Sequence, residues 1–186
     1  MKKVIFTLVF FALCAGFTSL VFADSLTFVK NPHGVTGPYQ FQVDVNNKSY
    51  LAWLVCGSDD NHITPPNTWS IEERSIGKMD GVWGKSEAQW KEAAYYASLL
   101  LKDPGNAGLQ GDVWASLGLG GSFDGTKYPS NWSAAGMDFY IPSPVSTTYS
   151  TSFPQPFIGT PEPASLVLLG SGLLGTLGIF RRRLTR

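Results

Sequence analysis

Cysteine and histidine are scarce in this chain, whose 186 residues include two of each. Cys14 lies in an apolar run at the N-terminus, which leaves Cys56 as the only cysteine in the remainder of the chain. A lone cysteine excludes an internal disulfide and is buried, reactive, bound to a partner or chemically capped. Because His33 and His62 stand in no ligand spacing, we expect no zinc site and, more broadly, no metal or cofactor.

Motifs of two common enzyme classes are also missing. No G-x-S-x-G occurs, which excludes the nucleophile elbow of α/β-hydrolases. The stretch G-L-G-G-S-F-D-G, residues 118–125, has no predicted strand before it and no Gly-Lys-Ser/Thr after it. It is therefore predicted to be a flexible loop and not a phosphate-binding loop. We expect a protein without enzymatic activity.

Long apolar runs occur only at the two ends of the chain. At the first end, Lys2 and Lys3 precede an apolar run that begins at Val4 and closes with V-F-A at Ala23. This three-part pattern predicts an export signal over residues 1–23, removed by cleavage after Ala23. An uncleaved membrane anchor is the alternative, which the glycine and hydroxyl residues inside the run disfavour.

The other end combines a short motif, an apolar segment and a basic cluster. Seventeen uncharged residues, Ala164–Phe180, form the apolar segment. As a helix they would span about 25 Å, enough for a thin hydrocarbon core, with the basic cluster in the cytoplasm. The flanking residues are Pro161, Glu162 and Pro163 before the segment and Arg181, Arg182 and Arg183 after it.

In this order, residues 161–186 resemble the PEP-CTERM sorting signal of Gram-negative bacteria. The resemblance implies a protein that is exported, held in the inner membrane by its C-terminal helix, and cut near P-E-P by an exosortase. It implies the cell surface or the extracellular matrix as the destination. A plain single-pass tail anchor is the alternative.

Charge is balanced over the whole chain but not over its exported part. The chain has 14 basic and 14 acidic residues, of which six basic and one acidic belong to the two terminal signals. The body, residues 24–160, keeps eight basic and thirteen acidic residues and a net charge of −5. An acidic body gives no support to nucleic-acid binding, which needs a basic face.

Apolar residues alternate with polar ones along Tyr39–Asn46, which predicts a strand with one buried face. A hairpin connection follows, and the continuous apolar run Tyr50–Cys56 predicts a central strand covered on both faces. Ser25–Val29 and Met137–Ile141 are weaker strand predictions. Residues 57–84 show no sustained period, although Ser70-x-x-Glu73 suggests a cap for a short helix.

The clearest helix is predicted over Ser86–Lys102, where Ser86 and Gln89 form a capping box. Asn106 is expected to cap a second helix, Ala107 to about Leu117. Residues 142–160 are rich in Pro, Ser and Thr and predict a stalk. We therefore expect an α+β domain over residues 24–141: an antiparallel β-sandwich or small barrel with a packed helical pair.

On the second helix, Gln110 shares a face with Val113, Trp114 and Leu117, so this glutamine is expected to point inward. The motif Q-G-D-V-W and a cysteine at a strand end resemble surface thioester domains. The family pattern has alanine at the position of Asp112, and an aromatic residue before the cysteine where this chain has Val55.

The resemblance implies an internal thioester between Cys56 and Gln110, formed with loss of ammonia and able to capture amines. Trp114, one helical turn from Gln110, would shield the bond, and Asp112 would place a carboxylate near it. The alternative is an unreactive copy of the same fold. The implied partners are surface amines or a matrix polysaccharide, and the implied function is attachment.

Two other readings use the loop after Cys56. Asp59, Asp60, Asn61 and His62 could ligate a cation, although such clusters usually stabilise turns. The enzymatic alternative is a hydrolase with Cys56 as nucleophile, His62 as base and Asp60 as its partner. It requires the six residues of loop after Cys56 to place the His62 base correctly.

Overall fold

The computed structural model describes residues 23–34, 36–59, 68–146, 148 and 154–160. All of the predicted export signal except Ala23, and the whole predicted sorting signal, residues 161–186, lie outside this part of the chain. The described elements are two α-helices, two short 3-10 helices and six strands. In order they are β1 Ser25–Lys30, β2 Tyr39–Val45, β3 Lys48–Cys56, β4 Thr68–Arg74, η1 Ile76–Lys78, η2 Val82–Gly84, α2 Glu87–Leu100, α3 Ala107–Leu117, β5 Asp138–Pro142 and β6 Phe157–Gly159.

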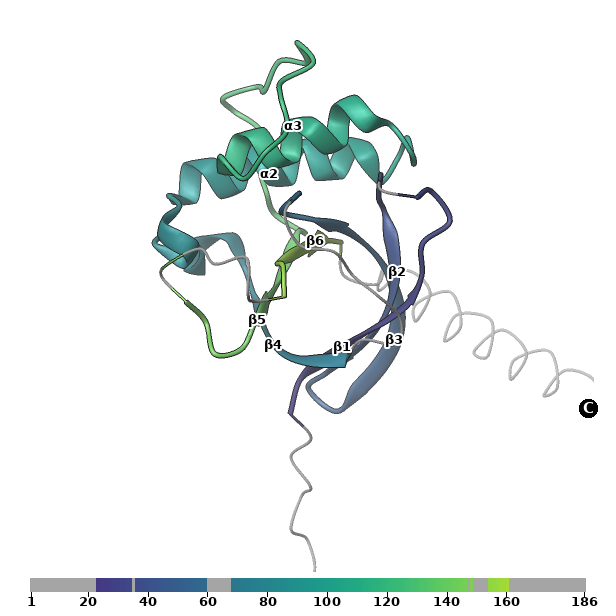
Figure 1. The fold of residues 1–186 in the computed structure, drawn as a ribbon. Coiled ribbons are helices and arrows are strands. Elements are labelled where there is room, and N and C mark those ends of the chain that lie inside the picture. Colours follow the sequence, from purple (N-terminus) through teal and green to yellow (C-terminus); the bar gives the residue numbers. More distant parts are fainter. Residues whose placement is uncertain (1–22, 35, 60–67, 147, 149–153, 161–186) are drawn as a thin grey trace, which may run out of the picture.

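The six strands close into an antiparallel barrel in the order β1-β2-β3-β6-β5-β4, with β4 pairing back to β1. Figure 1 looks into this ring, with the two helices above β6. The expected α+β fold with a small antiparallel barrel and a helical pair is therefore confirmed. Closure leaves no long free strand edge among these six strands.

Strand β2 shows how the sequence pattern produces the barrel wall. Tyr39, Phe41, Val43 and Val45 point into the barrel and are buried, while the residues between them face outward. The turn to β3 places Asn46 and Asn47 at φ of 52° and 61°. Asparagine tolerates this left-handed conformation, which a two-residue hairpin turn requires.

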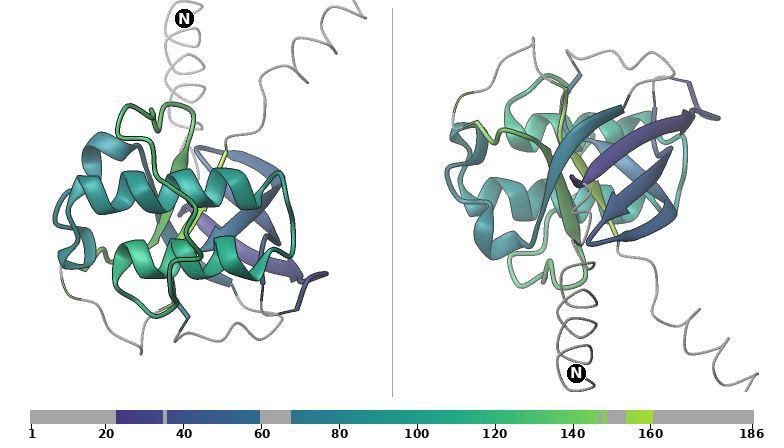
Figure 2. Two further views of the ribbon diagram at one scale, coloured as in Figure 1. Left: turned by 90° about the horizontal axis from the view of Figure 1, so that it is seen from above. Right: turned by 90° about the horizontal axis from the view of Figure 1, so that it is seen from below.

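Helices α2 and α3 begin at the predicted caps. The Ser86 side chain accepts from the Gln89 backbone N–H, and the Gln89 side chain accepts from the Ser86 N–H, completing the capping box. The Asn106 side chain accepts from Leu109 N–H. The helices lie side by side over one outer flank of the barrel, and the opposite flank, with β1 and β2, is left open (Figure 2).

Two apolar cores follow from this arrangement. The first fills the barrel and includes Phe41, Leu54, Cys56 and Phe157. The second lies between the barrel and the helices. Outward-facing strand residues and one face of each helix form it: Val55, Phe139, Ile141, Ile158, Trp90, Ala94, Ala97, Val113 and Leu117, with others. The helices thus bury strand residues that would otherwise be exposed on the barrel surface.

Strand β3 is not covered on both faces along its whole length, contrary to the expectation. Leu54, Val55 and Cys56 are buried, whereas Leu51 and Trp53 are 53% and 38% exposed. In a closed barrel every strand turns one face outward, and the helices cover that face only near the end of β3.

Two strands were missed. Residues 68–74, expected to be irregular with a capped helical turn near Ser70, form β4. Residues 142–160, expected to be a stalk, include β6, which pairs with β3 and β5 and is fully buried. The stalk prediction is wrong for Phe157–Gly159 because these residues close the barrel. The globular body therefore extends to Gly159 and not to residue 141.

Candidate functional site

Cys56 is the last residue of β3, at the point where the strand passes under α3. Its side chain is inside the barrel core and 2% exposed. The thiol donates a long hydrogen bond, 3.8 Å, to the Tyr39 hydroxyl. The following residue, Gly57, donates its N–H to the Pro156 carbonyl (2.9 Å), which holds this end of β3 against the segment that leads into β6.

Gln110 meets Cys56, although the two lie 54 positions apart in the chain. The Gln110 side chain is fully buried, as expected for an inward-pointing residue. Its Nε2 donates to the Cys56 carbonyl at 3.0 Å, and its Oε1 accepts from the Gly37 N–H at 3.1 Å. The carboxamide therefore joins three segments: the entry to β2, the end of β3 and helix α3.

Trp114 follows Gln110 by one turn of α3 and reaches the same carbonyl. Its Nε1 donates to the Cys56 oxygen at 3.2 Å, so two side chains four residues apart share one acceptor. Trp114 is partly exposed and packs against both cores. It is the partly exposed member of the group formed by Cys56, Gln110 and Trp114.

Burial sets the chemistry of the thiol. It raises the pKa of Cys56 to about 11, although the Trp114 indole and the Tyr39 hydroxyl beside it lower that pKa in part. The thiol is therefore protonated near neutral pH, and the reactive thiolate is rare. Burial also raises the pKa of Tyr39, which keeps its hydroxyl protonated beside the sulfur.

Gly37 was not singled out from the sequence. It contributes through its backbone N–H, which carries no residue-type signal. A Cβ added at Gly37 would lie 3.0 Å from Gln110 Oε1, so the absent side chain permits the close approach of the carboxamide.

Asp112 lies on a different side of α3. It lies two positions after Gln110, which rotates it by about 200° around the helix. Its Oδ1 accepts from the Asp124 N–H at 2.7 Å, and its Oδ2 has no hydrogen-bond partner among the described residues. Burial raises the pKa of Asp112 to about 6. This carboxyl anchors the glycine-rich loop and faces Asp124.

The glycine-rich loop lies directly on α3. A Cβ at Gly121 would be 2.3 Å from the Gly111 carbonyl oxygen, and one at Gly111 would be 3.1 Å from the Ser122 oxygen. The second residue of Q-G-D-V-W thus needs to be small because loop backbone packs on it. Within this motif, Gln110 contacts the barrel, whereas Gly111 and Asp112 contact the glycine-rich loop.

Of the predicted cation loop, Asp59 is described and exposed, whereas Asp60, Asn61 and His62 lie outside the described part of the chain. The arrangement of the cation loop and of the cysteine hydrolase is therefore not described. The sorting residues from Pro161 to Arg183 also lie outside the described residues. Within the described ranges, no group of three potential metal ligands occurs, and no helix is long and apolar enough to cross a membrane.

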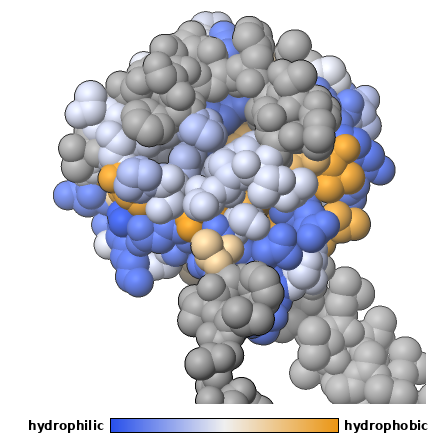
Figure 3. Space-filling model, turned by 60° about the horizontal axis from the view of Figure 1, so that its bottom comes forward, coloured by the Kyte–Doolittle hydropathy of each residue, from blue (hydrophilic) through white to orange (hydrophobic). Residues whose placement is uncertain are grey.

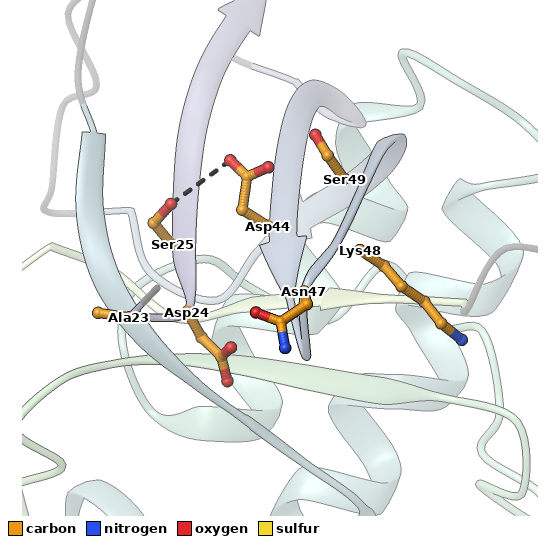
Figure 4. A pocket seen from close by; sticks show the side chains of 7 residues that line it. All are labelled: Ala23, Asp24, Ser25, Asp44, Asn47, Lys48 and Ser49. Carbon is orange, nitrogen blue, oxygen red and sulfur yellow. Dashed lines mark hydrogen bonds between the residues drawn. The ribbon is translucent and has the colours of Figure 1, made fainter. Parts of the chain in front are cut away.

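A pocket lies at the other end of β3, around the β2–β3 hairpin. Figure 4 shows its lining side chains, with Ser25 hydrogen-bonded to Asp44 at 3.5 Å. Ala23 forms part of its wall, so the predicted cleavage after Ala23 would reshape it. The pocket contains neither Cys56 nor Gln110, and we assign no function to it. Its lining is Ala23, Asp24, Ser25, Asp44, Asn47, Lys48 and Ser49.

Comparison with known proteins adds one finding. Residues 160–183 match a family described as the PEP-CTERM protein-sorting motif. No curated protein and no solved structure matches the chain. The match covers the C-terminal signal and not the barrel. It confirms the resemblance read from P-E-P and the arginines, and it identifies the chain as an exported protein that is sorted to the cell surface by an exosortase.

Proposed function

We propose that this protein is a surface attachment protein whose body forms an internal thioester between Cys56 and Gln110. One observation carries the proposal: the fully buried Gln110 carboxamide lies against Cys56, with its Nε2 atom 3.0 Å from the backbone carbonyl oxygen of Cys56. Two residues 54 positions apart have been brought together in a site that excludes water. We further propose that the protein binds and does not turn over a substrate.

The proposed step balances as follows. The Cys56 sulfur attacks Cδ of Gln110, the C–S bond forms, and the C–N bond to Nε2 breaks. The thiol proton leaves with Nε2, which departs as ammonia. Oε1 remains as the carbonyl oxygen of the thioester, so the Gly37 N–H can go on donating to it. This donor stabilises the negative charge that develops on that oxygen during attack.

The second step uses the thioester as an acyl donor. A primary amine on a partner attacks Cδ, an amide forms, and the Cys56 thiol is released with the proton from the amine. Cys56 and Gln110 are shielded from water, and the partly exposed Trp114 indole marks the side from which an amine approaches. Burial protects the ester from hydrolysis until the partner arrives.

A noncovalent alternative rests on a separate observation. The same Gln110 carboxamide satisfies both the Gly37 N–H and the Cys56 carbonyl, and the thiol pKa of about 11 keeps the sulfur protonated. Such a residue stabilises the barrel without reacting. In this case the body is a noncovalent binding or structural component of the surface or matrix.

Mass spectrometry of the surface protein recovered from its host separates the two. The thioester predicts a body about 17 Da lighter than its sequence, the mass of one ammonia, with the loss confined to the peptides of Cys56 and Gln110. Methylamine should release the thiol and leave residue 110 about 14 Da heavier than glutamine. Full mass with an unmodified Gln110 would end the covalent proposal.

Variants supply the control. Gln110→Glu keeps an acceptor for the Gly37 N–H but has no ammonia to release, and Cys56→Ala keeps a small side chain in the core. Both should fold, carry full mass and form no amine adduct. If either variant still formed the adduct, the reactive groups would lie elsewhere.

A further inference from the structure

Four exposed residues gather on the outside of the barrel near the point where the chain leaves it. Val29, Leu51 and Trp53 are 44%, 53% and 38% exposed. The Nζ atom of Lys30 lies 5.6 Å from the centre of the Trp53 ring. We name Val29, Lys30, Leu51 and Trp53 the β3 patch. On the face in Figure 3, apolar surface forms small groups among hydrophilic residues.

Strand register explains why these residues are neighbours. Trp53 pairs with Gln40, which pairs in turn with Lys30, and Leu51 pairs with Gln42. The patch therefore reaches from β1 to β3 on the flank that the helices do not cover, with Gln40 and Gln42 of β2 between its members. Lys30 contributes a positive charge to this flank, although the exported body as a whole carries −5.

The chain leaves the barrel beside this patch. Gly159, the last residue of β6, pairs with Leu54, and β6 runs antiparallel to β3. Its direction therefore points along β3 toward Trp53 and Leu51. Thr160 follows and is exposed.

The tether from barrel to bilayer is short. Four residues, 160–163, separate Gly159 from Ala164, where the predicted apolar span begins. Fully extended, they bridge at most about 18 Å. The headgroup layer on one side of a bilayer takes about 5–8 Å of that reach. With the predicted span in the bilayer, the part of the barrel around Gly159 would be held within about 10–13 Å of the membrane surface.

We propose that the β3 patch docks on the phospholipid surface of the membrane that holds the sorting segment, until the exosortase cut releases the body. The proposal rests on the membrane-held intermediate of the sorting pathway, and not on the thioester. Trp53 would lie at headgroup level, where tryptophan is favoured, and Lys30 would meet lipid phosphates. Leu51 and Val29 would enter the shallow apolar boundary.

Docking on these terms is reversible. A patch of four side chains binds a bilayer weakly by itself, but the four-residue tether gives it a high effective concentration at the surface. Cutting the tether removes that advantage, and the acidic body is then free to leave an anionic membrane. The patch thus orients the body while the exosortase cuts the chain, and it does not hold the released body on the membrane.

The test uses residues 24–186, the chain expected after removal of the export signal, with Cys56 replaced by alanine, in vesicles of phosphatidylethanolamine and phosphatidylglycerol. A nitroxide is attached at Leu51→Cys and, in a matched control, at Ser70→Cys on β4. Ser70 is exposed, and β4 lies three strands from β3 in either direction around the six-stranded ring. The collision rate with an aqueous nickel reagent should be at least about threefold lower at residue 51 than at residue 70.

Several outcomes decide the matter. Equal collision rates in a chain that floats with the vesicles would overturn docking and leave anchoring intact. A chain that does not float would overturn anchoring and docking together. Adding Lys30→Glu and Trp53→Ser should remove the protection at residue 51 while flotation persists. Protection that survives those changes would mean that the patch is not the contact. The thioester mass measurement is independent of each result.

Discussion

The two halves of strand β3 use the same kind of residue for opposite purposes. Its second half, Leu54–Cys56, is enclosed by the barrel, by β6 and by the helices. Its first half exposes Leu51 and Trp53 on the outer face. A single apolar run therefore serves both as core and as surface. Its hydrophobicity alone does not predict which of its residues are buried, because the elements that cover them come from residues 87–159.

The largest effect is expected from removing what covers the second half. A chain ending at Pro156 lacks β6 and loses the burial of Phe157 and Ile158, both fully buried. The loss should exceed about 5 kcal/mol, comparable to the whole stability of a small domain. Circular dichroism should show no cooperative unfolding, whereas a chain ending at Thr160 should unfold cooperatively. Equal transitions would show that β6 is dispensable.

A matched pair of truncations compares the halves directly. Leu54→Ala creates a cavity in the barrel core and should lower the free energy of unfolding by about 2–5 kcal/mol. Leu51→Ala, three residues earlier and half exposed, should change it by less than about 0.5 kcal/mol. Urea denaturation of both variants tests the contrast, and similar losses would contradict it.

The next effect concerns the hydrogen bonds at the end of β3. Gln110→Ala removes the partner of the Gly37 N–H and one of the two donors to the Cys56 carbonyl. An unpaired buried group costs about 1–3 kcal/mol, and the carbonyl keeps its bond from Trp114. We expect a loss of about 2–3 kcal/mol in the thiol form of the protein. Gln42→Ala, on the exposed face of β2, is the control and should be nearly neutral.

The smallest effect is a pH dependence from Asp112. Because its pKa is about 6 in the folded protein, against 3.8 for the free group, the folded state binds the proton more tightly. Its contribution to stability is therefore full below about pH 4 and is lost as the pH rises through about 6. Asp112→Asn should unfold at a higher temperature than the natural chain above pH 6, and the advantage should shrink toward pH 4. An advantage that does not vary with pH would argue against a protonated Asp112.

The sequence predicted the elements with a clear period. The alternation of β2, the capping box of α2 and the Asn106 cap each have local causes, and each appears as expected. Strand β6 has three residues, too few to show a period, and its flanks are rich in proline and serine. In β4 the Ser70-x-x-Glu73 pattern suggested a helix cap, but these residues form a strand because they pair with β1 and β5.

The candidate site was predicted through its motif and not through its geometry. The helical periodicity placed Gln110 inward, and the resemblance paired it with Cys56. The backbone groups that hold the carboxamide, the Gly37 N–H and the Cys56 carbonyl, depend on tertiary structure and leave no trace in residue type. For the same reason, the opposite orientation of Asp112, toward Asp124, emerged only from the fold.

The position of β6 in the chain ties folding to secretion. Among the six described strands, the one that completes the ring is also the last along the chain, so it is synthesised after both of its neighbours. In a chain that emerges from its N-terminal end, β3 and β5 would lack their common neighbour until the three residues of β6 have emerged. The ring of strands would stay open until then. An enzyme that cut the tail ahead of residue 157 would release a chain that has lost its closing strand.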